Sequence, residues 1–414
     1  MATIDLKYGR GVVPFDYAEE RFAVLAAASD DPPLDDRAIN EKLDRPIGAL
    51  PFEEVISPGE SVLIVVPDAT RSSGSSQIVN LLVRRLIANG TMPHEIRIIF
   101  ATGIHRPVER SERDDILTPF ITQRIRTIDH KASGIANLAI VGETSGGISV
   151  SLNGALIDSD HVIAIGAVTF HYFAGFTGGR KLICPGLASE RTIEATHKLA
   201  FDCETRSRRE GVGPGLLAGN AVHEAFLEAA KFIKNVFNIS TIVNDEGAIT
   251  DVFCGDLEAS HRAACEAVAA KCTVAIDAKR DVVIASCGGQ PYDINLIQAH
   301  KALDTAARAC ADGGRIILIA ECAEGSGRAD FLDWFDAENS DALAGKLCDG
   351  YRVNGQTAWN FLSICERFEV EMLTTLDDAV LKKLRVKKAD LSNVAGTGFI
   401  LPDGAKVNVT AISP

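Results

Sequence analysis

The chain has 414 residues, of which 46% are hydrophobic and 24% are charged, and its formal net charge is −14. This length exceeds one ordinary domain and suits two, and the composition excludes the disordered and fibrous classes. The acidic balance argues against a general surface for nucleic acid or for an anionic membrane. An anionic ligand must therefore meet a local basic site.

The N-terminal stretch MATIDLKYGRGVVPFDY lacks the basic segment and apolar core of a secretion signal, and no apolar run is long enough to span a bilayer. We therefore expect a cytoplasmic protein. The ten cysteines are scattered without a CxxC pair, which indicates neither a zinc site nor a disulfide framework. Most of them, Cys184 included, should be reduced core residues.

Short apolar runs predict buried strands, each followed by a small or polar loop, at residues 61–66, 96–100, 161–166, 281–286 and 315–320. Continuous β-branched runs are typical of parallel sheets that are covered on both faces. Amphipathic patterns at residues 76–90 and 295–314 predict helices, the second with a Gly-Gly at its end. The alternation predicts an α/β fold whose ligands bind beyond the carboxyl ends of the strands.

A charged stretch before a fresh strand–helix pattern places a domain boundary near residues 272–281. We expect an N-terminal catalytic domain over residues 1–275 and a C-terminal α/β domain over residues 276–393. The segment GTGFILPDGAKVNV predicts a hairpin, and the tail of about 394–414 should return to the first domain.

The loop HYFAGFTGGRKLICPG, residues 171–186, is rich in glycine and contains Lys181. It is not a Walker A loop, because Arg180 stands before the lysine and Leu182 stands where Ser or Thr is required. Its glycines still indicate a ligand close to the backbone, since glycine permits positive φ and close approach. A tight surface turn with a solvated lysine is the alternative.

Three histidines lie in or just after strand-end loops, at His105, His171 and His197. Histidine suits proton transfer and metal ligation, so these three could also form a catalytic zinc site with an open fourth position. The other six are expected to be structural or surface residues.

Two residue pairs, one of opposite charge and one of an amide with a lysine, complete the candidate site. Asp68 stands three residues before Arg71, so its carboxylate could hold a guanidinium that grips a substrate carboxylate. Gln298 and Lys301 are spaced i, i+3 and share one face of a helix.

Taken together, the motifs PDATR, TGIHRP, HYFAGFTGGRKLICPG, EATHK and DINLIQAHKALD resemble the nickel-dependent lactate racemase family. The resemblance covers nearly the whole chain in the family's order. It implies two α/β domains with largely parallel sheets and an active-site cleft between them. It also implies nickel held in a nickel–pincer nucleotide, pyridinium-3-thioamide-5-thiocarboxylic acid mononucleotide.

By this resemblance Lys181 would carry the cofactor covalently, His197 would bind nickel, and Thr177, Gly178 and Gly179 would pack on the cofactor. A 2-hydroxy acid would pass the C2 hydride to the cofactor and form a 2-keto acid, with His105 and His171 as the two acid/base groups. The substrate-binding residues would be Arg71, Asp68, Gln298, Lys301 and Phe173. Cofactor-biosynthesis proteins are the expected partners.

The substrate stays open within this family. Ile297 stands where the resemblance leads us to expect tyrosine in lactate-active members, and Trp359 is a further candidate for the pocket wall. Larger 2-hydroxy acids and sugar acids are alternatives to lactate. The other functional hypotheses are a three-histidine zinc hydrolase and a non-enzymatic nickel or nucleotide carrier, and Arg180 receives no role.

Overall fold

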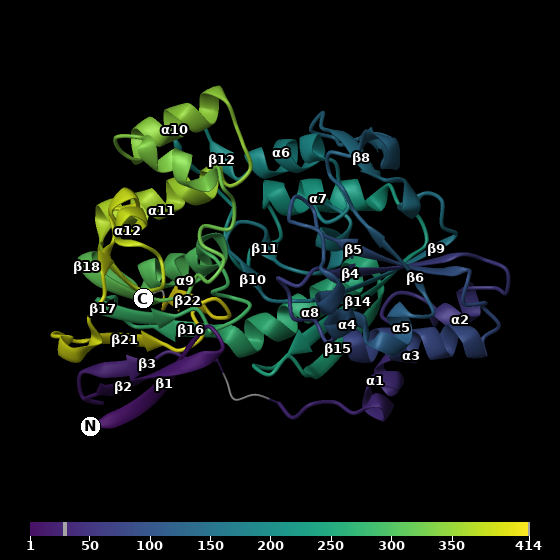
Figure 1. Ribbon diagram of the computed structural model, residues 1–414, viewed down its shortest axis with the longest axis horizontal. Coiled ribbons are helices and arrows are strands. Elements are labelled where there is room, and N and C mark those ends of the chain that lie inside the picture. Colours follow the sequence, from purple (N-terminus) through teal and green to yellow (C-terminus); the bar gives the residue numbers. More distant parts are fainter. Residues whose placement is uncertain (28–30, 413–414) are drawn as a thin grey trace.

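The computed structural model describes residues 1–27 and 31–412 and has two lobes, each built on a six-stranded sheet (Figure 1). The first lobe comprises residues 31–272, and the second comprises residues 1–27 and 273–412. Both sheets are largely parallel. The predicted fold class, two α/β units with largely parallel sheets, is confirmed.

In the first sheet the edge strand β15 runs antiparallel to its neighbour, and the other described strands run parallel to one another. In sheet order its strands are β15 (Ile249–Asp256), β14 (Val236–Val243), β9 (His161–Ala167), β4 (Val62–Pro67), β5 (Ile96–Ala101) and β6 (Arg126–Asp129). Every residue of β4 is buried, as expected for a strand with helices on both faces.

Helices cover both faces of this sheet. They are α1 (Asp36–Leu43), α2 (Phe52–Val55), α3 (Ser75–Ala88), α4 (Arg110–Leu117), α5 (Pro119–Thr122), α6 (Glu190–Lys198), α7 (Ala221–Lys231) and α8 (Leu257–Cys272). Successive residues of β4 enter opposite cores, because strand side chains alternate. Ile64 packs in the core beside α1 and α3, and Val65 packs in the core beside α6 and α7.

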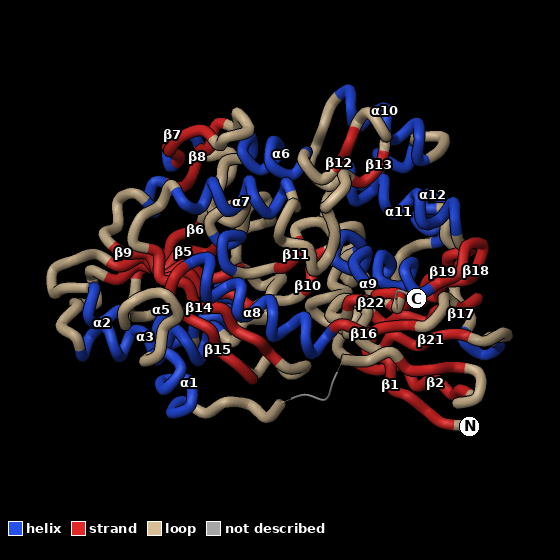
Figure 2. The backbone as a smooth tube through the Cα atoms, turned by 180° about the vertical axis from the view of Figure 1, so that it is seen from behind, coloured by secondary structure: helices blue, strands red, loops and turns tan. Residues whose placement is uncertain are grey.

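The second sheet is parallel throughout. In sheet order its strands are β20 (Lys387–Lys388), β19 (Glu369–Leu373), β18 (Cys310–Ile319), β17 (Arg280–Ser286), β21 (Gly398–Leu401) and β3 (Phe22–Val24). The helices α9 (Leu296–Ala309), α10 (Ser340–Asp349), α11 (Gly355–Arg367) and α12 (Asp378–Leu384) cover one face. The hairpin of β1 (Ala2–Tyr8) and β2 (Gly11–Tyr17) covers the other (Figure 2).

Short elements complete the chain. The two-stranded ribbons are β7 (Leu138–Glu143) with β8 (Ser149–Asn153), β10 (Phe170–His171) with β11 (Gly175–Phe176), β12 (Phe201–Asp202) with β13 (Ser207–Arg208), and β16 (Thr273–Ile276) with β22 (Asn408–Ala411). The 3₁₀ turns are η1 (Ile135–Asn137), η2 (Gly154–Leu156), η3 (Gly179–Leu182), η4 (Phe331–Asp336) and η5 (Leu391–Asn393). Within the described ranges, no helix is both long and apolar enough to cross a membrane.

The predicted C-terminal hairpin does not form. Strand β21 inserts between β17 and β3, and β22 pairs in parallel with β16, so the two strands belong to different sheets. The described part of the tail therefore packs with the second lobe, together with the N-terminal strands. The domain boundary near residue 275 stays a prediction.

Two further expectations need correction. The helix expected over residues 295–314 ends at Ala309, because Cys310 already pairs with Arg280 of β17. The cysteines are not all reduced, since Cys203 and Cys348 form a disulfide between the β12–β13 ribbon of the first lobe and α10 of the second. Their separation of 145 residues leaves no local spacing signal.

Candidate active site

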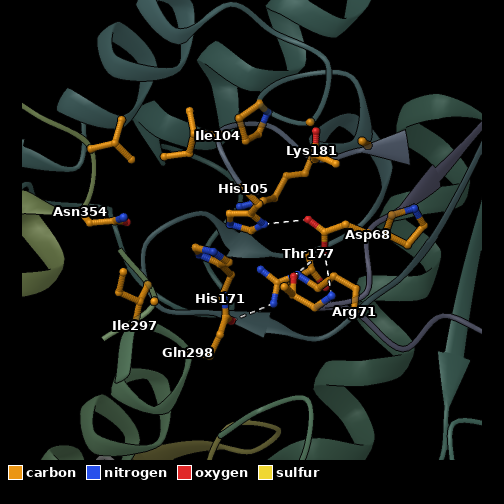
Figure 3. Close-up of a pocket in the computed structure, with 18 of the residues that line it drawn as sticks. Asp68, Arg71, Ile104, His105, His171, Thr177, Lys181, Ile297, Gln298 and Asn354 are labelled. Atoms are coloured by element: carbon orange, nitrogen blue, oxygen red, sulfur yellow. Dashed lines mark hydrogen bonds and ion pairs between the residues drawn. The ribbon is translucent and has the colours of Figure 1, made fainter. Parts of the chain in front are cut away.

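A cavity of about 310 Å³ lies between the lobes (Figure 3). The loops that follow β4, β5, β9 and β18 contribute to its wall, as do the segment that begins α9 and the start of α11. The candidate residues that line it are Asp68, Arg71, His105, His171, Phe173, Thr177, Gly178, Lys181, His197, Gln298 and Lys301. The cavity therefore lies where the sequence places the ligand site, beyond the carboxyl ends of the strands.

Asp68 and His105 form an acid–imidazole pair in which the carboxylate is buried and the imidazole is exposed. The Nδ1 atom of His105 lies 2.7 Å from Oδ2 of Asp68, and Thr70 donates to Oδ1 of that carboxylate through its backbone N–H (2.9 Å) and hydroxyl (2.6 Å). Burial alone would raise the pKa of Asp68, but the facing His105 and these hydrogen bonds hold it at about 2. The ionised carboxylate requires the proton of His105 on Nδ1, which leaves a lone pair on Nε2.

Two basic side chains, Arg71 and Lys301, meet at the amide of Gln298 at the lobe boundary. The amide oxygen of Gln298 accepts from Nη1 of Arg71 at 3.0 Å and from Nζ of Lys301 at 2.6 Å. The sequence had suggested that Asp68 holds Arg71. The Asp68 side chain forms its hydrogen bond with His105 and acts on Arg71 through its charge. Burial and the nearby Arg71 and Lys181 lower the pKa of Lys301 well below its usual value. An anionic group placed here would relieve this repulsion.

His171 is buried in the loop after β9, and its ring meets that of Phe173 edge-on with centroids 4.5 Å apart. The backbone N–H of Ala174 donates to Nδ1 of His171 at 3.3 Å, so the neutral ring carries its proton on Nε2. Burial, together with the charges of Lys181 and Lys301, lowers its pKa well below 6.5.

The glycine loop brings the backbone close to the cavity. Gly178 lines the cavity with φ +72°, and a Cβ there would lie 3.0 Å from the carbonyl oxygen of Ala167. Gly179 does not line the cavity, because its Cα faces His261, where a Cβ would come within 2.5 Å of the ring. The hydroxyl of Thr177 donates to the Ala167 carbonyl at 2.8 Å and fixes the loop.

Arg180, which the sequence left without a role, is buried beneath this loop. Its Nη2 donates to the carbonyl oxygen of Ala174 at 2.6 Å, and its Nη1 lies 3.0 Å from Nε2 of His261. Burial lowers its pKa to about 10. Arg180 therefore fixes the loop and adds a positive charge beside Lys181. The thiol of Cys184 is also buried, which raises its pKa to about 12 and makes it unreactive.

Lys181 lies in a pocket with aromatic walls. Its Nζ is 5.4 Å from the ring centre of Phe173 and 5.3 Å from that of Phe226. Burial, and then the charges of Arg180 and Arg71, lower the pKa of this amine well below 10.5. An unprotonated lysine amine is a nucleophile, which is the property that a covalent attachment site needs.

His197 projects from α6 with one ring nitrogen already bonded. Its Nδ1 donates to the carbonyl oxygen of Ile193 at 2.8 Å, which leaves the Nε2 lone pair free. Burial lowers its pKa to about 3, so the ring is neutral at ordinary pH. A neutral imidazole that is oriented through its other nitrogen is the usual form of a histidine metal ligand.

The three histidines do not form a metal site by themselves. Across residues 1–27 and 31–412, no cluster of three or more His, Cys, Asp or Glu side chains could hold a metal ion. This finding counts against the three-histidine zinc hydrolase. A metal at His197 would need further ligands from a bound group.

The cavity wall differs from expectation on the second-lobe side. Trp359 does not line the cavity and packs on Phe201, with ring centres 5.0 Å apart. Ile297 does line it, with Asn354 and Thr357 at the start of α11, which sequence reasoning missed (Figure 3). The Asn-Gly pair at residues 354–355 is a turn signal, and Asn354 has φ +73°.

The fold and the cavity define a two-lobed α/β protein with its candidate active site between the carboxyl ends of two largely parallel sheets. The model of the lactate racemase N-terminal domain matches residues 8–208, and that of the lactate racemase C-terminal domain matches residues 275–395. The chain belongs to the lactate racemase family. It is an isomerase of the racemase class.

Two relatives extend over most of the chain. The lactate racemase of Lactiplantibacillus plantarum is 32% identical over 337 residues, which are 80% of this chain and 77% of the relative. The lactate racemase of Thermoanaerobacterium thermosaccharolyticum is 30% identical over 340 residues, 81% of this chain and 78% of the relative.

Solved structures share this fold. The lactate racemase apoprotein of Thermoanaerobacterium thermosaccharolyticum superposes with a TM-score of 0.87 at 26% identity and covers 99% of this chain and 100% of its own. A protein from Thermotoga maritima gives a TM-score of 0.72 at 19% identity over 93% of this chain and 100% of its own, which shows a shared fold.

Proposed function

We propose that this protein interconverts the two configurations at C2 of a 2-hydroxy acid, with a nickel–pincer nucleotide on Lys181 as cofactor and a 2-keto acid as intermediate. The observation that carries the proposal is the placement of His105 and His171 in one cavity with a carboxylate clamp of Arg71, Gln298 and Lys301. A 2-hydroxy acid offers the two groups that this arrangement can bind, a carboxylate and a neighbouring hydroxyl.

The residues present fit the proposed cofactor. Lys181 offers a buried amine of lowered pKa, and His197 offers one free imidazole nitrogen. Because no further protein side chains gather as ligands in the described ranges, a group that brings its own carbon and sulfur ligands suits this site. When bound, such a cofactor supplies a reversible acceptor for the C2 hydride.

The two histidines would move the hydroxyl proton, one for each enantiomer. Asp68 prepares His105 to accept a proton at Nε2, because it keeps the ring proton on Nδ1. For the other enantiomer, His171 would have to give up the 3.3 Å contact from the backbone N–H of Ala174 and carry its proton on Nδ1, so that Nε2 can accept the hydroxyl proton. The clamp would hold the carboxylate while the carbonyl plane of the keto acid turns over.

Lactate is the first substrate to test, since the relatives are named lactate racemases. Ile297, Ile104 and Val353 supply apolar wall to the same cavity, so larger 2-hydroxy acids belong in the same series.

The test uses protein produced together with the cofactor-making proteins. Peptide mass spectrometry should find a mass addition on the Lys181 peptide and none in the variant Lys181→Ala. Active enzyme with an unmodified Lys181 would rule out the covalent attachment.

The chemistry is tested by racemisation of a series of 2-hydroxy acids in heavy water. We expect the C2 hydrogen to be retained, whereas deuterium at C2 of the product would indicate proton abstraction and contradict hydride transfer. Apo-protein with zinc alone is the control, and full activity of that sample would overturn the cofactor proposal.

A further inference from the structure

Tyr172 connects a candidate catalytic histidine of the first lobe to the second lobe. It stands between His171 and Phe173 in the loop after β9 and is buried. Its hydroxyl forms a hydrogen bond with the hydroxyl of Thr357, in the first turn of α11. The neighbour of His171 in the sequence is therefore held by a side chain from across the cavity.

The ring of Tyr172 lies against the imidazole of His171. The two rings are stacked, with centroids 5.4 Å apart and an interplanar angle of 18°. Phe173 and His300 meet the tyrosine ring edge-on, at 4.7 and 4.8 Å between centroids. Because these contacts surround the tyrosine, a change in its position would be transmitted to the plane of His171.

The second-lobe side of this contact is itself fixed by hydrogen bonds. The Nδ2 atom of Asn360 donates to Nε2 of His300 at 2.7 Å and to Oδ1 of Asp304 at 2.9 Å. Asp304 is buried and pairs with Arg208 of the first lobe at 2.5 Å, and the guanidinium of Arg208 also lies 6.0 Å from the ring centre of Tyr172. Tyr172 thus packs on a platform with paired charges that spans both lobes.

We propose that Tyr172 is a positioning residue for proton transfer, whose hydroxyl bond to Thr357 sets the plane of the His171 ring relative to the substrate. This inference rests on the proposed function and goes beyond it, because it makes the geometry of His171 depend on the second lobe. Proton transfer requires a hydrogen-bonding distance and direction, so a small rotation of the ring lowers the rate more than it lowers binding.

The test removes the hydroxyl bond from either end and keeps the shapes, with Tyr172→Phe, Thr357→Val and the double variant. In cofactor-loaded enzyme each should lower kcat about 10- to 100-fold while KM changes less than about twofold. The double variant should be no worse than Tyr172→Phe, because removal of the Tyr172 hydroxyl already removes its bond to Thr357. Ser363→Ala, which removes a hydroxyl bonded to the Asn360 carbonyl on the same helix, is the control and should keep the wild-type kcat.

A second readout needs no cofactor. In the apo-protein, diethylpyrocarbonate should modify His171 several times faster in Tyr172→Phe and Thr357→Val than in wild type, as followed by peptide mass spectrometry. Wild-type kcat with a wild-type modification rate in both variants would overturn the proposal. So would a loss of kcat in Tyr172→Phe that Thr357→Val does not share.

The two hypotheses fail in different ways. If loaded wild-type enzyme racemises none of the 2-hydroxy acids, the proposed function is wrong, and the modification rate of His171 still decides whether Tyr172 positions it. If wild type is active and the variants match it in both readouts, only the positioning role is wrong.

Discussion

The carboxylate of Asp68 lies 2.7 Å from Nδ1 of His105, and this contact determines which nitrogen of the imidazole faces the chemistry. With the pKa of Asp68 held at about 2, the carboxylate is ionised at neutral pH and can only accept, so Nδ1 must donate. The free lone pair on Nε2 makes His105 a base in the neutral state.

Replacement of Asp68 by asparagine should therefore disable His105 without removing it. The amide of Asp68→Asn can donate to Nδ1 and so stabilise the tautomer that carries its proton on Nε2. We expect kcat to fall between about 10²- and 10⁴-fold, the usual contribution of a positioned acid–base group. The measurement is racemisation followed by chiral chromatography, at a cofactor load fixed from the Lys181 peptide.

Asp44→Asn is the matched control for this change, because Asp44 pairs with Arg85 on the surface of the first lobe. It should racemise at the wild-type rate. An unimpaired Asp68→Asn variant would show that the tautomer of His105 does not limit turnover.

Arg71→Lys tests the carboxylate clamp. The guanidinium presents a planar fork that matches a carboxylate, whereas an ammonium keeps the charge and loses the paired geometry. Because the carboxylate is bound in both ground state and transition state, the loss should appear mainly in KM, with a rise of about tenfold or more. Initial rates against substrate concentration measure it.

The control for the clamp is Arg113→Lys, since Arg113 pairs with Asp129 away from the cavity wall. It should leave KM unchanged. An Arg71→Lys variant with wild-type KM and a lowered kcat would place Arg71 in the chemical step instead of in substrate binding.

The sequence could predict the features that depend on local pattern. Continuous apolar runs such as VLIVV identify strands buried on both faces, and parallel strands bring their carboxyl-end loops to one edge. This is why His105 and His171 could be expected near each other before their contacts were known. Spacing within α9 was likewise enough to place Gln298 beside Lys301.

Features that depend on distant pairing could not be predicted. Asp68 seemed a partner for Arg71 at a spacing of three residues, but β4 and β5 are neighbours in the sheet and bring His105 closer. The same limit applies to the termini, because Phe22 of β3 pairs with Gly398 of β21, 376 residues further along the chain. Thr357 lines the cavity because the two lobes pack together, and no local sequence pattern indicates that packing.

Because His130 is buried as a neutral ring, we expect the free energy of unfolding to fall in mild acid. Its ring is buried between Asn153 and the Ala188 carbonyl, and burial lowers its pKa from 6.5 to about 4. As the pH falls from 6.5 to 4, the unfolded chain takes up a proton that the folded chain does not, so folding stability declines across this window. The full loss from this group is about 3 kcal/mol.

The variant His130→Gln should be less stable at pH 7.5, because it disturbs two buried hydrogen bonds. Its free energy of unfolding should nevertheless decline less between pH 7.5 and 5 than that of wild type, as measured by urea unfolding. Equal pH slopes for the two proteins would show that His130 does not titrate differently on folding.

We expect the disulfide between Cys203 and Cys348 to raise the free energy of unfolding, and reduction of this bond tests the expectation. It closes a separation of 145 residues between the lobes, and the closure entropy of so long a loop stabilises the folded state by up to about 5 kcal/mol. We expect Cys203→Ser, Cys348→Ser and the double variant to lower the free energy of unfolding by a similar amount, about 3–5 kcal/mol. Reductant should lower the free energy of unfolding in wild type and have no effect on the double variant, which is the control.

A thiol count tests the disulfide directly. Wild-type protein that is denatured without reductant should react with a thiol reagent at eight cysteines. If all ten cysteines titrate, the covalent link is absent, and the ion pairs Arg206–Asp341 and Arg208–Asp304 hold this side of the lobe boundary without it.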